Sequence, residues 1–300
     1  MSNKNFYLSS GGGLGDLMDN YLGRVVEWGY LEEVKKAHPD CKIKVVLCIH
    51  NEQSRTFLEA NPYIDELIWC PYRHDGTPVY EMHRGDYQDL SVLKLRRNFT
   101  YKVPEIHLTQ EDKDVVDPII SDGPYVFMHP FAGETRRSWP DHYDIKTIID
   151  ALCNLGKRVV VVGGSYERTA YLNSVIGQDL SIGQMEEVLD YERDGLVNLV
   201  GKCNSRIAAY LCQKAERFIG THSCYILVAW RTNIPALCIA PNWMTSHFQN
   251  HDNSCWGFER SFPQNSLVYY DKVDEIGIDA VVNEWTQNPS RPFFDKALCP

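Results

Sequence analysis

Hydrophobic runs alternate with amphipathic segments along most of the chain, which predicts alternating strands and helices. In the first half, residues 43–50 form a continuous apolar run, typical of a strand that is buried on both faces of a parallel sheet. A shorter apolar run at residues 6–8 precedes a segment from Leu17 to His38 whose apolar residues begin with helical spacing. Strands and helices that alternate in this way favour a parallel sheet with crossover helices.

The second half repeats this alternation more regularly. A helix is predicted around Ile145 to Leu152, where isoleucines and a leucine recur at i, i+3, i+4 and i+7. Short apolar runs predict strands at residues 125–130, 157–164, 198–201, 217–220 and 236–240. The last candidate helix, near residues 274–285, follows a polar loop rich in aromatic residues. Two packings are open for this helix, against the C-terminal lobe or back across the N-terminal one.

The length of the chain indicates two domains, because 300 residues exceed an ordinary doubly wound core. The acidic stretch at residues 111–124 contains two prolines and is interpreted as a linker. We therefore expect an N-terminal Rossmann-like domain at residues 1–120 and a C-terminal Rossmann-like domain at residues 121–300. Residues 72–103 show no clear period, and irregular segments of this length are often binding loops.

Composition narrows the class of protein. With 44% hydrophobic and 23% charged residues, the chain is typical of a folded globular protein. A net charge of −10 disfavours nucleic acid as a partner without excluding a local basic patch. The ten cysteines are scattered, as expected of buried thiols in a reducing compartment. Neither a leader peptide nor an apolar run near the roughly 20 residues of a membrane span is visible, so a cytoplasmic location is predicted.

A glycine loop at residues 9–16 joins the first predicted strand to the first predicted helix. Main-chain N–H groups and the helix dipole favour an anion at such a place, and Gly13 and Gly15 permit a close approach. The loop matches neither the dinucleotide fingerprint nor the P-loop. The alternative is a tight turn in which Asp16 caps the helix, although Asp16 also lies at the carboxyl edge of the strand, where open α/β sheets bind ligands.

A second polar cluster, residues 129–140, follows the first strand of the second half. Arg136 and Arg137 are suited to clamp a diphosphate with forked donors, and Gly133 and Thr135 belong to the turn before them. A solvated arginine pair is the alternative. Cations at a helix N-terminus oppose its dipole, however, which favours a functional role.

Two further clusters follow later strands of this half. Glu167 comes after a pair of glycines and is suited to bind a ribose or a base edge, although an acidic residue in a first helical turn is favourable in any case. Thr221, His222 and Ser223 precede an apolar helix, where anions bind. The histidines and cysteines lack metal-ligand spacing, so no metal site is expected.

Taken in this order, the four clusters resemble glycosyltransferase family 9, the heptosyltransferase family of the GT-B fold. Residues 10–22, SGGGLGDLMDNYL, are similar to the glycine loop and aspartate of that family, and RRSWP at residues 136–140 is similar to its basic residue before Trp-Pro. Residues 198–220 resemble its nucleotide-side segment. The chain departs from the family at His222-Ser223-Cys224, where the family usually has Asp-Ser-Gly, and at Leu227, where it has histidine.

The resemblance implies GT-B architecture, with two Rossmann-like doubly wound domains that face a central cleft. It implies an inverting glycosyltransferase that moves a sugar from a nucleotide-diphosphate sugar to an acceptor hydroxyl, with no required metal or other cofactor. Asp16 then corresponds to the base, and Arg137 stabilises the leaving diphosphate. The implied donor-binding residues are Gly13, Gly15, Gly133, Thr135, Arg136, Glu167, Thr221, His222 and Ser223.

The acceptor and the donor sugar stay open at this stage. The family resemblance favours a glycan or a lipopolysaccharide-type saccharide as acceptor, bound by the N-terminal domain. His222 in place of the aspartate leaves three alternatives: transfer to a protein side chain, transfer to a hydroxylated DNA base, or an inactive nucleotide-sugar-binding protein. The sequence does not decide between hexosyl, heptosyl and pentosyl donors, nor the oligomeric state.

Overall fold

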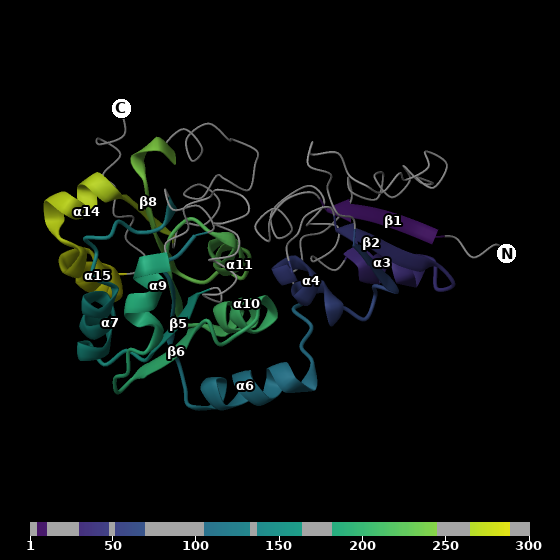
Figure 1. Ribbon diagram of the computed structural model, residues 1–300, viewed down its shortest axis with the longest axis horizontal. Coiled ribbons are helices and arrows are strands. Elements are labelled where there is room, and N and C mark those ends of the chain that lie inside the picture. The colour runs from purple at the N-terminus through teal and green to yellow at the C-terminus, as the bar shows by residue number, and fades with distance from the viewer. Residues whose placement is uncertain are drawn as a thin grey trace. The chain divides into compact units, whose positions relative to one another are not determined.

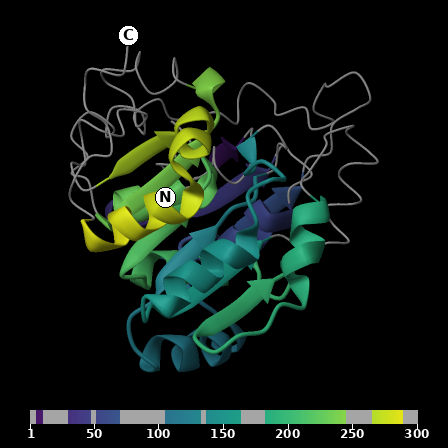
Figure 2. The ribbon, with the colours of Figure 1, turned by 90° about the vertical axis from the view of Figure 1, so that its left-hand side faces the viewer.

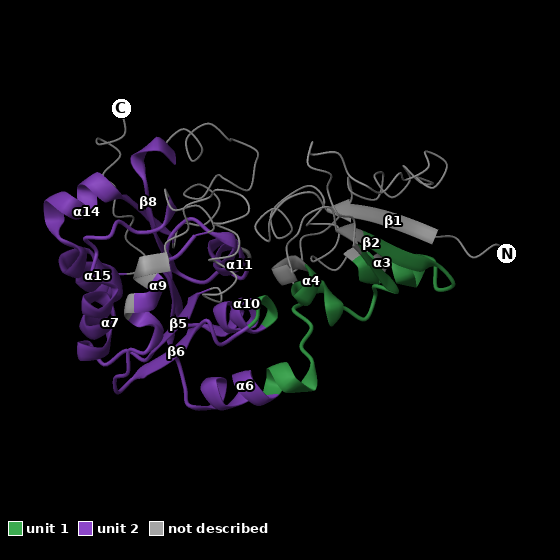
Figure 3. Ribbon diagram, in the orientation of Figure 1, with its two compact units in different colours: residues 1–113, 204–206 green, residues 114–203, 207–300 purple. Residues whose placement is uncertain are grey.

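The computed structural model describes residues 5–10, 30–47, 52–69, 105–132, 137–163, 182–244 and 265–288 (Figure 1). The chain divides into two compact units (Figure 3). Unit 1 comprises residues 1–113 and 204–206, and unit 2 comprises residues 114–203 and 207–300. The division at residues 113 and 114 lies inside helix α6 (Gln110–Ser121), which ends next to the boundary predicted from the sequence.

Unit 1 is built on a parallel sheet. Its strands β1 (Asn5–Ser10), β2 (Lys42–Leu47) and β3 (Glu66–Trp69) are hydrogen-bonded in the order β1-β2-β3. Helices α3 (Tyr30–Ala37) and α4 (Glu52–Glu59) lie in the connections, as the alternating pattern predicts. The buried apolar side chains of these elements include Leu31, Val34, Ile43, Val45, Phe57 and Leu58.

The described residues of unit 2 form a six-stranded parallel sheet in the order β6-β5-β4-β7-β8-β9. The strands are β4 (Val126–His129), β5 (Val159–Gly163), β6 (Leu196–Val200), β7 (Arg217–Gly220), β8 (Ala236–Ala240) and β9 (Ser266–Tyr269). This is the Rossmann order, in which the direction of winding reverses between the first and the fourth strand. Here that switch point lies between β4 and β7, and ligands of such sheets bind at the carboxyl ends of the strands there.

Helices cover both faces of the unit 2 sheet (Figures 1 and 2). They are α7 (Ile145–Asn154), α9 (Ile182–Leu189), α10 (Ser205–Lys214), α11 (Cys224–Arg231), α14 (Tyr270–Ile276) and α15 (Ile278–Gln287), with a short helix η3 (Asn242–Met244). Val126 and Met128 of β4 point into the core that α7, α9 and α15 share. Phe127, between them, contacts Phe218 and Tyr225 instead. The sheet is therefore doubly wound, and its strand β4 is apolar on both faces.

Residues 111–124, interpreted as a linker from the sequence, lie mostly in helix α6, and the division between the two units falls inside this helix. A reciprocal capping box starts the helix: Thr109 Oγ1 accepts a hydrogen bond from Asp112 N (3.2 Å), and Asp112 Oδ2 accepts one from Thr109 N (3.0 Å). Val116 and Ile119 then bury one face of the helix. The segment thus joins the two units through a helix, which the sequence interpretation missed because it weighed acidic residues and prolines above the cap and the apolar spacing.

The C-terminal elements differ from the sequence prediction in two ways. The single helix predicted at residues 274–285 is two helices, α14 and α15, divided by Gly277 at a φ of +90°. The sequence left open against which lobe the last helix packs. Helix α15 packs within unit 2, where Val281, Val282 and Trp285 join the core. Strand β9 was not predicted, because its four residues follow a long stretch without period. No helix within the described ranges has both the length and the apolar character to cross a bilayer.

Unit 1 also contains a buried ion pair. Arg206 Nε lies 2.8 Å from Asp112 Oδ2, and the two side chains are 8% and 3% exposed. Asn204 Nδ2 donates a hydrogen bond to Asp112 Oδ1 (2.7 Å), and the Arg206 guanidinium donates to the Thr56 carbonyl. Burial acts to raise the pKa of Asp112, but the hydrogen bonds from Arg206 and Asn204 outweigh it and lower that pKa below its usual range.

Asp112→Asn is expected to lower the free energy of unfolding by about 3–5 kcal/mol at pH 7, because it leaves the buried Arg206 charge with only the more distant and more exposed carboxylate of Glu59 (3.8 Å) as a counterion. Urea unfolding measures the effect. The pKa of Asp112 is lower in the folded state than in the unfolded state. The ion pair therefore stabilises the fold above the unfolded-state pKa, and this stabilisation disappears as the pH falls through the folded-state pKa. The difference in the free energy of unfolding between wild type and Asp112→Asn should therefore become smaller below about pH 4.

The matched control is Glu216→Gln, which breaks a partly exposed ion pair with Lys157 (3.1 Å) and should cost less than about 1 kcal/mol. A loss in Asp112→Asn no larger than that of the control would show that the Asp112–Arg206 pair does not stabilise the fold.

Candidate functional site

The carboxyl ends of β4 and β7 meet at the switch point of the unit 2 sheet. His129 and Gly220 are register partners there. A Cβ atom on Gly220 would lie only 2.3 Å from the His129 carbonyl oxygen, so this close approach requires glycine. Thr221 N then donates to the same carbonyl (3.0 Å). These contacts fix the turn after β7 against the end of β4.

Two hydroxyl groups hold the main chain at Arg137. The hydroxyl of Thr221 donates to the Arg137 carbonyl, and the side chain of Thr221 is buried. The Tyr270 hydroxyl lies 2.9 Å from the same carbonyl and also within hydrogen-bonding distance of the Ser138 carbonyl. Thr221 follows β7 and Tyr270 follows β9, so the ends of two strands position one segment of the β4–α7 connection.

The Arg137 side chain lies at the same edge of the sheet. Its guanidinium carbon is 6.0 Å from the ring centroid of Trp243, within the range of a cation–π contact. Trp243 belongs to η3, directly after β8, and is 42% exposed. Arg137 itself is half-buried. A forked cation is therefore held at the carboxyl edge of the sheet by groups that follow β7, β8 and β9.

The N-terminus of α11 lies at the switch point. Ser223 is its N-cap residue, but the side chain makes no hydrogen bond to the described first turn of the helix. Its hydroxyl lies 2.9 Å from His129 Nδ1 instead. Complete burial of the imidazole lowers the pKa of His129 to about 3, so the ring is neutral at physiological pH. Burial also raises the pKa of the Cys224 thiol to about 12, so no thiolate opposes an anion at this helix end.

Four of the predicted site residues are among the described ones, and unit 2 brings them together. Thr221 donates to the Arg137 carbonyl, Ser223 is the N-cap residue of α11, and the side chain of His222 is buried. The other predicted site residues lie outside the described residues, as does the irregular segment 72–103; they are Asp16, Gly13, Gly15, Gly133, Thr135, Arg136 and Glu167.

Three contributors to this geometry did not emerge from the sequence as site residues. Tyr270 follows a strand that was not predicted. Trp243 follows β8, and its position as an aromatic residue soon after a predicted strand is the sequence signal that could have identified it as a site residue. His129 opens the second polar cluster but was given no role there, whereas its ring contacts Ser223 and packs edge-to-face on Tyr225, with centroids 4.7 Å apart.

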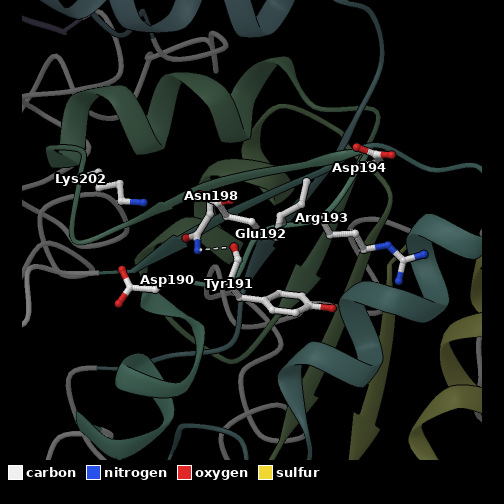
Figure 4. Close-up of a pocket in the computed structure, with 8 residues that line it drawn as sticks. Asp190, Tyr191, Glu192, Arg193, Asp194, Asn198 and Lys202 are labelled. Atoms are coloured by element: carbon white, nitrogen blue, oxygen red, sulfur yellow. Dashed lines mark hydrogen bonds between the residues drawn. The ribbon is translucent and has the colours of Figure 1, made fainter.

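A separate cavity of about 600 Å³ lies along the edge strand β6 (Figure 4). The loop 190–194, together with Lys202, lines it, and none of the predicted site residues does. Asn198 Nδ2 donates to the Tyr191 carbonyl (3.1 Å) and so fixes the loop to the strand. The carboxylates of Asp190, Glu192 and Asp194 outnumber the two cations, Arg193 and Lys202, that also border the cavity, which disfavours a diphosphate there. The switch point is thus the better anion site.

No protein-family model and no curated protein sequence matches the chain. Several solved structures do. The E. coli ADP-heptose LPS heptosyltransferase II aligns with a TM-score of 0.56 and 14% identity, over 95% of this chain and 98% of that one. A glycosyltransferase of family 9 from Veillonella parvula gives 0.53 and 14%, over 92% and 88%. E. coli heptosyltransferase WaaC with ADP gives 0.51 and 11%, over 95% and 97%.

At such identities the similarity establishes the fold. The α/β fold with parallel sheets that the sequence predicts is confirmed, and it is the GT-B fold of these glycosyltransferases.

Proposed function

We propose that this protein is an inverting, metal-independent glycosyltransferase that moves a sugar from a nucleotide-diphosphate sugar to an acceptor hydroxyl. The observation that carries the proposal is the Arg137 guanidinium, held at the carboxyl edge of the sheet whose switch point also contains the N-terminus of α11. The fold supports it, since the similar structures are glycosyltransferases and one of them is described with ADP, a nucleotide of the proposed leaving-group type.

The chemistry of the leaving group fits these residues. As the bond between the anomeric carbon and the diphosphate oxygen breaks, negative charge accumulates on the diphosphate. A forked guanidinium and the N–H groups of a helix N-terminus are suited to stabilise that charge. Because His129 is neutral, the positive charge comes from Arg137, together with Arg136 in the proposal. Gly133, Thr135, Glu167, His222 and Ser223 complete the proposed donor site on sequence grounds.

The acceptor side of the reaction is assigned to residues 1–120. The acceptor hydroxyl attacks the anomeric carbon, its oxygen forms the new glycosidic bond, and its proton passes to the carboxylate of Asp16. The mechanism requires Asp16 to reach the attacking oxygen rather than the sugar ring. Gly13 and Gly15, in the loop that carries Asp16, are proposed to contact the donor. A saccharide is the proposed acceptor.

The cysteines support a cytoplasmic location. All those among the described residues are free thiols, namely Cys41, Cys153, Cys203, Cys212, Cys224 and Cys238. Free thiols persist in reducing compartments, so we propose that the reaction takes place in the cytoplasm.

A panel of ADP-, UDP- and GDP-sugars tests the proposed function. Without an acceptor, the protein should hydrolyse one class of donor slowly and release the nucleoside diphosphate, which chromatography quantifies. The release should persist in the presence of a chelator, because no metal is required. Binding of a donor without hydrolysis or transfer would instead favour a nucleotide-sugar-binding protein that has lost catalysis. The observation that favours this second candidate is His222, which stands where the resembling family has an aspartate.

A further inference from the structure

Tyr270 contacts the main chain of the candidate site but has no role in the proposed function. Its hydroxyl lies 2.9 Å from the Arg137 carbonyl and also contacts the Ser138 carbonyl. The ring is half-buried, and burial raises the pKa of the hydroxyl, so it is protonated and shares its one proton between the two carbonyls. Tyr270 is thus the point at which the end of β9 meets the β4–α7 connection.

Tyr270 is itself held in place. Tyr143 donates from its hydroxyl to the Tyr270 carbonyl (3.0 Å), and the two rings pack edge-to-face at a centroid distance of 6.0 Å and an angle of 82°. The main chain of Tyr143 belongs to the same connection as Arg137. This connection is therefore tied to Tyr270 at two points.

We propose that Tyr270 is a positioning residue that fixes the main chain of Arg137 and thereby aims the guanidinium at the diphosphate of the donor. This inference rests on the proposed function. The carbonyl of Arg137, a residue in 3-10 conformation, accepts side-chain hydrogen bonds from Thr221 and Tyr270, which fix the main chain at this point. The Trp243 ring supports the other end of the side chain. Because a displacement of about 1 Å at a catalytic group can cost on the order of 10²-fold in rate, a missing anchor should be measurable.

The test is Tyr270→Phe, which removes one hydroxyl and keeps the ring. We expect kcat for donor hydrolysis to fall about 10–100-fold, because a displaced guanidinium stabilises the negative charge of the leaving diphosphate less well. KM should change less, since that charge is greatest in the transition state. The matched control is Tyr125→Phe, which removes a buried hydroxyl that donates to the Leu211 carbonyl (2.7 Å) elsewhere in unit 2. The kcat of Tyr125→Phe should equal that of wild type, although this variant should lose about as much thermal stability as Tyr270→Phe.

A double variant separates positioning from a general structural effect. If Tyr270 acts through Arg137, Tyr270→Phe should change kcat by less than about 2-fold in an Arg137→Ala background. A full effect of Tyr270→Phe in that background would overturn the inference. Thr221→Val removes the other hydroxyl from the same carbonyl and should reproduce the loss, which keeps the test valid if Tyr270→Phe folds poorly.

The failure of this inference differs from the failure of the proposed function. Wild-type protein that binds none of ADP, UDP and GDP in calorimetry would overturn the proposed function and, with it, the role of Tyr270. Wild-type turnover combined with identical kcat values for Tyr270→Phe and Tyr125→Phe would overturn the role of Tyr270 alone.

Discussion

Asp16→Asn is expected to lower kcat for sugar transfer by about 10²–10⁴-fold, the usual contribution of a general base. The amide keeps the size of the carboxylate but accepts no proton from the acceptor hydroxyl. Binding of the nucleoside diphosphate should stay nearly unchanged, because the proposed donor contacts of Arg137 and α11 belong to unit 2. Transfer rates and calorimetric affinities for the nucleoside diphosphate separate the two effects.

Asp19→Asn is the matched control for this prediction. It makes the same change of charge three residues later in the chain and should leave kcat at the wild-type value. Retained transfer by Asp16→Asn would show that another group takes the acceptor proton.

Arg137→Met should lower kcat by about 10²–10³-fold, the usual cost of removing one group that stabilises transition-state charge. Arg137→Lys keeps the positive charge but loses the forked donors, so we expect it to recover only part of the rate. Steady-state kinetics with the preferred donor measures both variants. The affinity of Arg137→Met for the nucleoside diphosphate should also fall and depend less on salt concentration.

Arg55→Met is the control for the loss of an arginine. Arg55 is exposed on α4 in unit 1 and pairs with Glu59, so its removal should leave kcat unchanged. Wild-type kinetics in both Arg137 variants would contradict the proposed role of this residue in stabilising the leaving group.

The parts of the fold that the sequence predicts well are those where burial dictates composition. Strands β4, β5 and β8 are buried along their whole length, and such continuous apolar runs are conspicuous in the sequence. Helix α7 combines the predicted apolar spacing with an N-cap, Asp144, whose side chain accepts a hydrogen bond from Lys146 N.

The parts that sequence reasoning missed depend on short or long-range signals. The capping box of α6 occupies four residues inside an acidic stretch, and β9 follows a long stretch without a period. At the site, Arg137 and Ser223 were predictable because each follows a buried strand. The contact between Tyr270 and Arg137 joins residues 133 positions apart, and only the folded chain reveals it.

Thr221 illustrates how the structure refines a candidate role. The sequence suggested a donor contact, because Thr221 precedes a helix. Its side chain is buried, and its hydroxyl donates to the Arg137 carbonyl. In our proposal Thr221 therefore acts on the donor through the position of Arg137.

A crystal structure with the tightest-binding nucleoside diphosphate tests the central claim most directly. The account predicts electron density for the diphosphate at the N-terminus of α11, with its oxygens within hydrogen-bonding distance of the Arg137 guanidinium. Density for the diphosphate in the cavity along β6, or at any other place away from Arg137, would contradict it.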